Sequence, residues 1–350
     1  MKLPFFLLLL PVSFAALITP FSSPENMEGA VLGFIEDNDN ITIAVYTFES
    51  PVVAPLLARK NATLLVEKSP AGGIPDMAVL CYLRDNGINV LLYNGSLRYM
   101  HAKYAVSGNH SLIMSENIGD FRNRGWGAIV EDNNIANRLR RVSEQDAAAS
   151  IPFHCNGNYT FAAKQGNSAG LPQYDGDAEL VIAPDAVGAI VDFVSSAKER
   201  LWLEQFYVYR RWGNERNALL DAFLNSKAGD KRIIIDGSWY NLDKEDKNSN
   251  YYTNEYLAML NVPVKIKKDV VIHNKGAVAD TRALVSSINW NENSPRNNRE
   301  IGVIISGAAA DYYALRFRED WGEKIAPPEF ITVFIFSVII VTLWLLRGKR

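Results

Sequence analysis

The sequence predicts an α/β protein made of two similar α/β/α sandwich halves that pack about a pseudo-twofold axis. One observation is an internal repeat, in which a His-x-Lys pair at His101 recurs 172 residues later at His273. Another is that each half begins with a stretch of helical period, followed by apolar strands. The third is length, because about 310 residues lie between two apolar ends and suffice for such a fold.

The repeat is clearest around the two histidines. The segment YAVSGNHSLIMS, residues 104–115, aligns without a gap on GAVADTRALVSS, residues 276–287. Both segments have the pattern of two strands joined by a turn. The same shift superimposes four further pairs, which are Lys103 on Lys275, Ser115 on Ser287, Asn117 on Asn289 and Gly108 on Asp280.

The elements upstream of each histidine follow the same order in both halves. A helix after a proline leads into an apolar strand, and further helices and strands alternate after it. The predicted helices span 27–37, 76–86, 186–198, 217–226 and 254–260, and the predicted strands span 41–48, 62–67, 88–93, 201–209, 231–236 and 262–267. The predicted halves are residues 24–165 and 175–326, joined by the polar segment 162–177.

Both ends of the chain have the composition of targeting or membrane segments. Residues 1–15 resemble a signal peptide, with small residues before a cleavage site after Ala15. Residues 330–346 carry no charge and predict a transmembrane helix, followed by a basic tail, 347–350. Basic residues favour the cytoplasmic side, so we expect a single-pass protein of the cell membrane with an extracytoplasmic domain. An uncleaved signal anchor and a lipid-anchored tail are the alternatives.

Composition narrows the function classes. The formal net charge is −3, which gives no overall nucleic-acid footprint but leaves a local basic groove possible. Cys81 and Cys155 are the two cysteines, and in an exported protein they form either one disulfide or two buried thiols. No paired Cys-x-x-Cys spacing occurs, so we expect no structural zinc site.

The paired His-x-Lys segments suit chemistry at a phosphodiester. Residues i and i+2 of a strand point to the same face, so each histidine points with its lysine. One imidazole can attack phosphorus while the other protonates the leaving oxygen and then activates water or an alcohol. The two lysines, with Asn117 and Asn289, would stabilise charge on the non-bridging oxygens. This chemistry needs no metal or cofactor.

These motifs resemble those of the phospholipase D superfamily. HNKGAVAD fits its His-x-Lys-x4-Asp motif and ends at Asp280, SSIN resembles its small-Ser-x-Asn element, and RNNREIGVII resembles the segment whose acidic residue, here Glu300, orients a catalytic histidine. The resemblance covers residues 24–326, and the SSINWNENSPRNNREIGVII stretch is similar to an archaeal, membrane-anchored branch. It implies catalytic roles for His101, His273, Lys103, Lys275, Asp280 and Glu300, and substrate contacts from Asn117, Asn289, Ser115 and Ser287.

The first half departs from the family pattern at two positions. Gly108 stands where the motif has Asp280, and Gly125 stands where the second half has Glu300. We therefore expect His101 to lack the usual orienting carboxylate. Glu116, Glu131 and Asp132 are the candidates to replace it.

The predicted function is a membrane-tethered phosphodiesterase that hydrolyses or transfers the headgroup of a phospholipid through a phosphohistidine. The resemblance assigns the nucleophile to the first-half histidine, but the residues alone do not decide this. One alternative is an exported nuclease of the same superfamily. Another is a catalytically weakened surface protein that binds phosphate or lipid. The membrane is expected as a partner through the C-terminal helix, and no obligate protein partner is evident.

Overall fold

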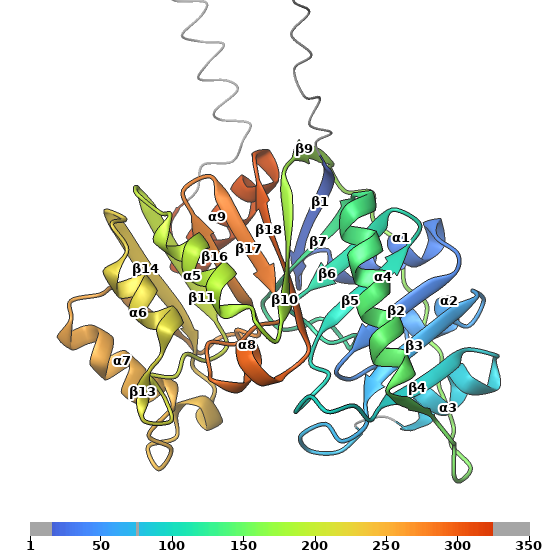
Figure 1. Cartoon of the computed structure of the whole chain (residues 1–350). Helices are drawn as coiled ribbons and strands as arrows, with labels where there is room; N and C mark the ends of the chain where they lie inside the picture. Colours follow the sequence, from blue (N-terminus) through green and yellow to red (C-terminus); the bar gives the residue numbers. More distant parts are fainter. Residues whose placement is uncertain (1–15, 75–76, 325–350) are drawn as a thin grey trace, which may run out of the picture.

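The computed structural model describes residues 16–74 and 77–324 (Figure 1). The predicted signal peptide, membrane span and tail therefore lie outside the described residues. Within residues 16–74 and 77–324, no helix combines the length and the apolar character that a membrane crossing requires.

Two mixed sheets form the framework, and their central strands follow the same order. The first sheet is ordered β8-β4-β3-β2-β5-β6-β7-β1-β9, and the second β10-β18-β17-β16-β11-β14-β15. In the first sheet, strands β1 to β9 are, in order, Ala16–Ser23, Ile41–Val45, Ala62–Glu67, Asn89–Tyr93, Lys103–Ser107, His110–Met114, Gly125–Glu131, Ser150–Pro152 and Tyr174–Gly176. In the second sheet, β10 is Ala178–Ala183 and β11 is Arg200–Gln205. Strands β14 to β18 of that sheet are, in order, Asp230–Asp236, Val264–Lys267, Lys275–Ala279, Arg282–Ser286 and Glu300–Ser306. A short separate ribbon pairs β12, Arg211–Trp212, with β13, Glu215–Arg216.

Helices cover the outer faces of the sheets and also flank the interface between the halves (Figure 1). The first half contains α1–α4, which are Met27–Asp37, Val53–Leu57, Met77–Asp85 and Asn133–Ala148. The second contains α5–α9, which are Val187–Ser195, Ala218–Asn225, Asn250–Met259, Asn293–Asn297 and Ala308–Trp321, with a 3₁₀ helix, η1, at Trp239–Leu242.

Three hydrophobic cores account for this layering. One lies under α1–α3, a second lies under α5–α7, and the third joins both sheets with α4 and α9 between the halves. Along β2, Ile43 and Val45 point into the first core, whereas Ala44 points into the shared one, as the twofold period of a strand requires. Strands buried on both faces read as continuous apolar runs, which is why the sequence pattern identifies them.

The predicted elements agree well with the structure. The helix 27–37 and the strand 62–67 have the predicted bounds, and the other predicted helices and strands differ only at their ends. Several elements have no predicted counterpart, among them β1, β7, β10, β18, α4 and α9. In α4 the core-facing residues Ile135, Leu139 and Val142 do recur at helical spacing, so the amphipathic pattern is present in the sequence although most of the helix is polar.

Cys81 and Cys155 form a disulfide with a Cα–Cα distance of 5.4 Å. The bond joins α3 to the segment that follows β8. It resolves the alternative that the sequence leaves open.

Two buried ion pairs cross the interface between the halves in a symmetric way. Arg299 binds both carboxylate oxygens of Asp146 on α4, at 2.8 and 3.0 Å. Arg124 lies 2.8 Å from Asp320 on α9. Each arginine therefore extends from one half and pairs with a helix of the opposite half. Moving one sheet relative to the other would separate these buried charges, so the ion pairs help to fix how the sheets are placed.

We predict that Arg299→Ala lowers the free energy of unfolding by about 3–5 kcal/mol, because it leaves the Asp146 carboxylate buried without its partner. Urea denaturation measures this change. Adding Asp146→Asn should recover part of the loss. Arg84→Ala removes an exposed pair with Asp85 and should change stability by less than about 0.5 kcal/mol. Equal effects of Arg299→Ala and Arg84→Ala would contradict the structural role of the buried pair.

Candidate active site

Each of the two histidines is held by the main chain of the opposite half. His101 N donates to Arg299 O at 2.9 Å, and His273 N donates to Arg124 O at 2.9 Å. Single parallel bridges, Met100 with Arg299 and Arg124 with Ile272, accompany these bonds. The histidines precede β5 and β16 directly, so both lie where the two sheets meet.

Each histidine also pairs with a carboxylate of the opposite half. His101 Nδ1 lies 2.9 Å from Glu300 Oε2, and His273 Nδ1 lies 3.2 Å from Glu116 Oε1. The two imidazole side chains are 16% and 18% exposed, whereas both carboxylates are buried. Because an ionised carboxylate only accepts hydrogen bonds, Nδ1 of His101 carries the proton, and the contact with Glu116 favours the same tautomer of His273, which leaves Nε2 of each ring for chemistry.

The expectation that His101 lacks a carboxylate is wrong. Glu300 does not orient the histidine of its own half but reaches across the interface to His101. Of the three candidates, Glu116 takes up the corresponding position at His273. Glu131 instead binds His110 at 2.5 Å, and Asp132 caps α4 through Ile135 N.

Local geometry explains how Glu116 replaces the carboxylate that Gly125 cannot supply. A Cβ atom on Gly125 would lie 2.6 Å from Glu116 Cγ and 2.9 Å from Glu116 Oε1. The Glu116 side chain therefore fills the space that a side chain at position 125 would occupy. In the second half the arrangement is reversed, with Glu300 on β18 and the apolar Ile288 at the position that aligns with Glu116.

The two lysines are fully buried beside the histidines. Lys103 Nζ donates to His101 O, and Lys275 Nζ donates to His273 O. Each ammonium also lies over an aromatic ring, Lys103 above Tyr46 at 5.4 Å and Lys275 above Phe206 at 5.2 Å. Burial lowers the pKa of Lys103 to about 8 and that of Lys275 to about 7, although Glu116 and Glu300 oppose the shift.

The titration of the site follows from burial and from the charges that meet there. Burial lowers the pKa of His101 to about 4, against the opposing effect of Glu300. Burial also lowers the pKa of His273. The positive charges of Lys103 and Lys275 lower the pKa of both imidazoles further. Burial alone would raise the pKa of Glu116 and Glu300, but their histidine and lysine neighbours outweigh it and hold both carboxylates ionised.

Asp280 lies away from this site. It follows β16 in the hairpin turn with φ 52°, and its carboxylate accepts the backbone N–H groups of Lys198, Glu199 and Arg200 at 2.9–3.0 Å. It lies five positions after Lys275 along the strand, which corresponds to about 17 Å. Its counterpart Gly108 has φ 53° in the equivalent turn. The structure thus gives Asp280 a role in shaping the turn, and we leave it out of the proposed catalytic set.

The two serines also act on the framework of the site. Ser287 Oγ donates to Glu300 Oε2 at 2.6 Å, and Ser115 Oγ accepts Trp126 N at 3.0 Å. Ser294 Oγ and Asn298 Nδ2 complete the donors to Glu300. The sequence pattern does not identify Ser294 and Asn298 as site residues. Their only signal is their place in the polar stretch directly before Glu300.

Asn117 lies in the same cavity wall as His273, and Asn289 is its counterpart in the repeat. The Oδ1 atom of each is buried without a hydrogen-bond partner within the described part of the chain. Asn117 also lines a cavity of about 300 Å³ beside His273. The other residues that line it are Glu49, Pro51, Glu116, Gly119, Asp120, Phe121 and Asn123.

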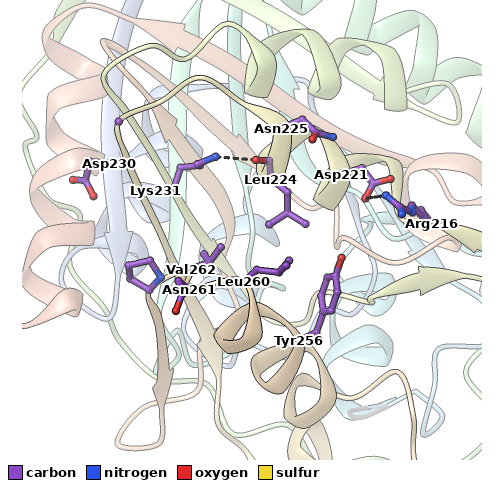
Figure 2. Close-up of a pocket in the computed structure, with 12 residues that line it drawn as sticks. Arg216, Asp221, Leu224, Asn225, Asp230, Lys231, Tyr256, Leu260, Asn261 and Val262 are labelled. Carbon is purple, nitrogen blue, oxygen red and sulfur yellow. Dashed lines mark hydrogen bonds and ion pairs between the residues drawn. The ribbon is translucent and has the colours of Figure 1, made fainter.

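A second cavity, of about 650 Å³, lies between α6, α7 and the start of β14 (Figure 2). It contains no histidine. Its charged groups are already partnered, Lys231 Nζ with Leu224 O at 2.8 Å and Arg216 with Asp221 at 3.9 Å. We therefore place the chemistry at the first cavity. Across the described residues, no group of three or more His, Cys, Asp or Glu is arranged to hold a metal ion.

Comparison with known proteins bears on the fold. Residues 190–321 match the family model described as "Cardiolipin synthase, PLD-like domain". No curated protein matches the chain in sequence.

Among solved structures, the phosphatidylserine synthase of Haemophilus influenzae Rd KW20 is 10% identical with a TM-score of 0.60, covering 89% of this chain and 90% of its own. The polyphosphate kinase of Porphyromonas gingivalis is 13% identical with a TM-score of 0.55, over 85% of this chain and 46% of that one. Nuc from Salmonella typhimurium, a phospholipase D family member, is 16% identical with a TM-score of 0.36, over 42% of this chain and 95% of its own. Residues 190–321 are therefore similar to this PLD-like domain, and the fold of most of the chain is similar to that of the phosphatidylserine synthase and the polyphosphate kinase.

Proposed function

We propose that this protein is a phosphodiesterase of the phospholipase D type that acts through a phosphohistidine intermediate. The observation that carries the proposal is the paired site, in which two His–Lys pairs meet and each imidazole is oriented by a carboxylate of the opposite half. A nucleophile and an acid, each held by a third group, are what two-step displacement at phosphorus requires.

We assign the nucleophile to His101 and the general acid to His273. His101 Nε2 attacks phosphorus, the bond from phosphorus to the leaving oxygen breaks, and His273 Nε2–H gives its proton to that oxygen. Water or an alcohol then loses a proton to His273 and attacks phosphorus, and the P–N bond breaks to restore His101. The pKa of His101, lowered to about 4 by burial, keeps this imidazole neutral and nucleophilic near pH 7.

Substrate charge supplies the protonation that His273 needs. Lys103 and Lys275, with the amides of Asn117 and Asn289, would stabilise the non-bridging oxygens. A bound phosphodiester anion raises the pKa of a neighbouring imidazole, because an opposite charge favours the protonated form. Binding of substrate therefore prepares His273 to act as the acid.

A phospholipid headgroup ester fits the charges of the site better than a nucleic acid does. The cavity beside His273 is lined by the carboxylates of Glu49, Glu116 and Asp120, and the net charge of the chain is −3. A polyanionic strand is bound by basic grooves, and its neighbouring phosphates would be repelled here. Export and membrane tethering complete the proposal, supported by the predicted terminal segments and by the Cys81–Cys155 disulfide.

We predict that the full-length protein in detergent hydrolyses bis(p-nitrophenyl) phosphate in excess EDTA at an unchanged rate. His273→Ala should lower this rate by about 10²–10⁴-fold, because it removes the base that takes a proton from the attacking water when the phosphohistidine is hydrolysed. His110→Ala is the matched control, since His110 pairs with Glu131 and Asn38 outside the site. Release of p-nitrophenol measures the rates. Loss of wild-type activity in EDTA, or no wild-type activity in a folded sample, would refute the proposal.

The pH dependence of kcat/KM should follow the free enzyme. Below about pH 4, protonation of His101 removes the nucleophile, so kcat/KM rises as the pH passes that value. The alkaline decline of kcat/KM then has two sources, because His273, whose pKa burial lowers, loses its acid proton, and above about pH 7 Lys275 loses the charge that binds the diester. Lys275→Arg keeps its charge at all these pH values and should move the alkaline decline upward. An alkaline limb that stays in place in this variant would exclude Lys275 as its origin.

The relocated carboxylate predicts a rescue experiment. Glu116→Ala should lower kcat by about 100-fold or more, because His273 loses the group that orients it. Adding Gly125→Glu places a carboxylate on β7 in the space that Glu116 vacates, as Glu300 does on β18, and should restore much of the activity. Glu131→Ala, which removes a carboxylate from His110, serves as the control. A double variant no better than Glu116→Ala would show that position 125 cannot supply this group.

A further inference from the structure

An exposed pair of aromatic side chains that the proposed reaction does not use is connected to His273 through the ring of Phe206. Trp239 is 84% exposed and Tyr240 is 45% exposed, on the 3₁₀ helix η1 that follows β14. We call these two residues the aromatic lip. A tryptophan this exposed presents a large apolar surface to water, and such surfaces mark contact sites when they lie beside a functional centre.

A chain of aromatic rings connects the lip to the reacting group. The ring of Phe206 lies 5.0 Å from that of His273, and the ring of Tyr240 lies 6.2 Å from that of Phe206. Trp239 and Tyr240 are 5.6 Å apart. The lip is thus the outer end of an apolar path that leads to His273.

The lip is held firmly in its exposed position. Asp236 Oδ2 accepts Ser238 N at 2.9 Å and Asn241 Nδ2 at 3.0 Å, which fixes both ends of the turn. Gly237 N donates to Lys267 O at 2.7 Å. Since Asp236 Oδ1 also accepts Ile272 N at 2.8 Å, next to His273, the same carboxylate sets the lip relative to the site.

The charges beside the lip indicate what it contacts. The run Asp243 to Lys247 follows at once and contains three carboxylates and two ammonium groups. The pKa of Tyr209 is raised, mainly by burial and also by the nearby negative charge of Asp246. The ring of Tyr209 stacks on that of Tyr207, which in turn contacts the ring of Phe206. This surface carries a net negative charge, which opposes a polyanionic strand. Tryptophan and tyrosine are the side chains that favour the interface between lipid headgroups and water.

We propose that the aromatic lip docks the site onto the surface of a zwitterionic lipid assembly. The inference rests on the proposed phosphodiesterase activity and specifies how the enzyme meets its substrate. The lip inserts at the headgroup level, and the path along Tyr240 and Phe206 then faces a phosphodiester at that surface. The half-1 counterpart of Phe206, Tyr46, instead accepts a hydrogen bond from Ala71 N, so docking through these rings is confined to the His273 side.

The test uses one short-chain phosphatidylcholine below and above its critical micelle concentration. The full-length protein is held in an amphipol, and headgroup release is measured. Wild type should show a jump in rate when micelles form. Trp239→Ser/Tyr240→Ser should keep the rate on monomers and reduce the rate on micelles by about 10-fold, because the two aromatic anchors are lost. The matched control is Met259→Ser/Leu260→Ser, which removes an adjacent pair of exposed apolar side chains on another element and should keep the jump.

The outcomes separate docking from catalysis. A jump that persists in the lip variant overturns the proposal, and so does an equal loss on monomers and micelles, which would place the lip against a single substrate molecule. If wild type hydrolyses neither monomeric nor micellar phosphatidylcholine, the proposed activity fails. Docking is then tested by measuring how much of the amphipol-held protein sediments with phosphatidylcholine vesicles. Reduced sedimentation of the lip variant relative to the control variant supports docking, and equal sedimentation overturns it.

Discussion

The exchange of carboxylates between the two halves is the interaction on which the site depends. Each imidazole takes its main-chain partner and its acidic partner from the opposite sheet. Neither half on its own supplies both His101 or His273 and the carboxylate that pairs with it. The chemistry is therefore coupled to the packing of the interface, and whatever holds the sheets together also sets the geometry of the reacting atoms.

The buried charges of the site are balanced in number. Lys103 and Lys275 bring two ammonium groups, and Glu116 and Glu300 bring two carboxylates, all of them buried. Burial of an unpaired ion costs several kcal/mol, so this balance is what makes the cluster tolerable in the folded state. A phosphodiester then adds one negative charge, which the cluster can offset by taking up a proton on an imidazole. Substrate binding and protonation of the acid are thus expected to be linked.

The sequence predicts the repeat, both histidines and most strands, because these features depend on local pattern and on a gapless alignment. It does not predict the partner of each histidine. An alignment compares equivalent positions, and Glu116 aligns with Ile288 rather than with Glu300. Only the packing shows that its side chain fills the space above Gly125. Asp280 shows the converse, since a motif position that suggests catalysis is explained by a turn with positive φ and three N–H donors.

The two carboxylates are held to different degrees, and this difference favours the assignment of roles. Besides His101, Glu300 accepts hydrogen bonds from Ser287, Ser294 and Asn298, whereas Glu116 accepts one from Asn123 at 3.3 Å. A firmly fixed imidazole suits in-line attack on phosphorus, which tolerates little misplacement. The less constrained His273 adjoins the cavity of about 300 Å³, where the leaving group departs and water enters in the proposed mechanism. The pseudo-twofold fold therefore supports two similar histidines, and the departures from symmetry around them give each one a different task.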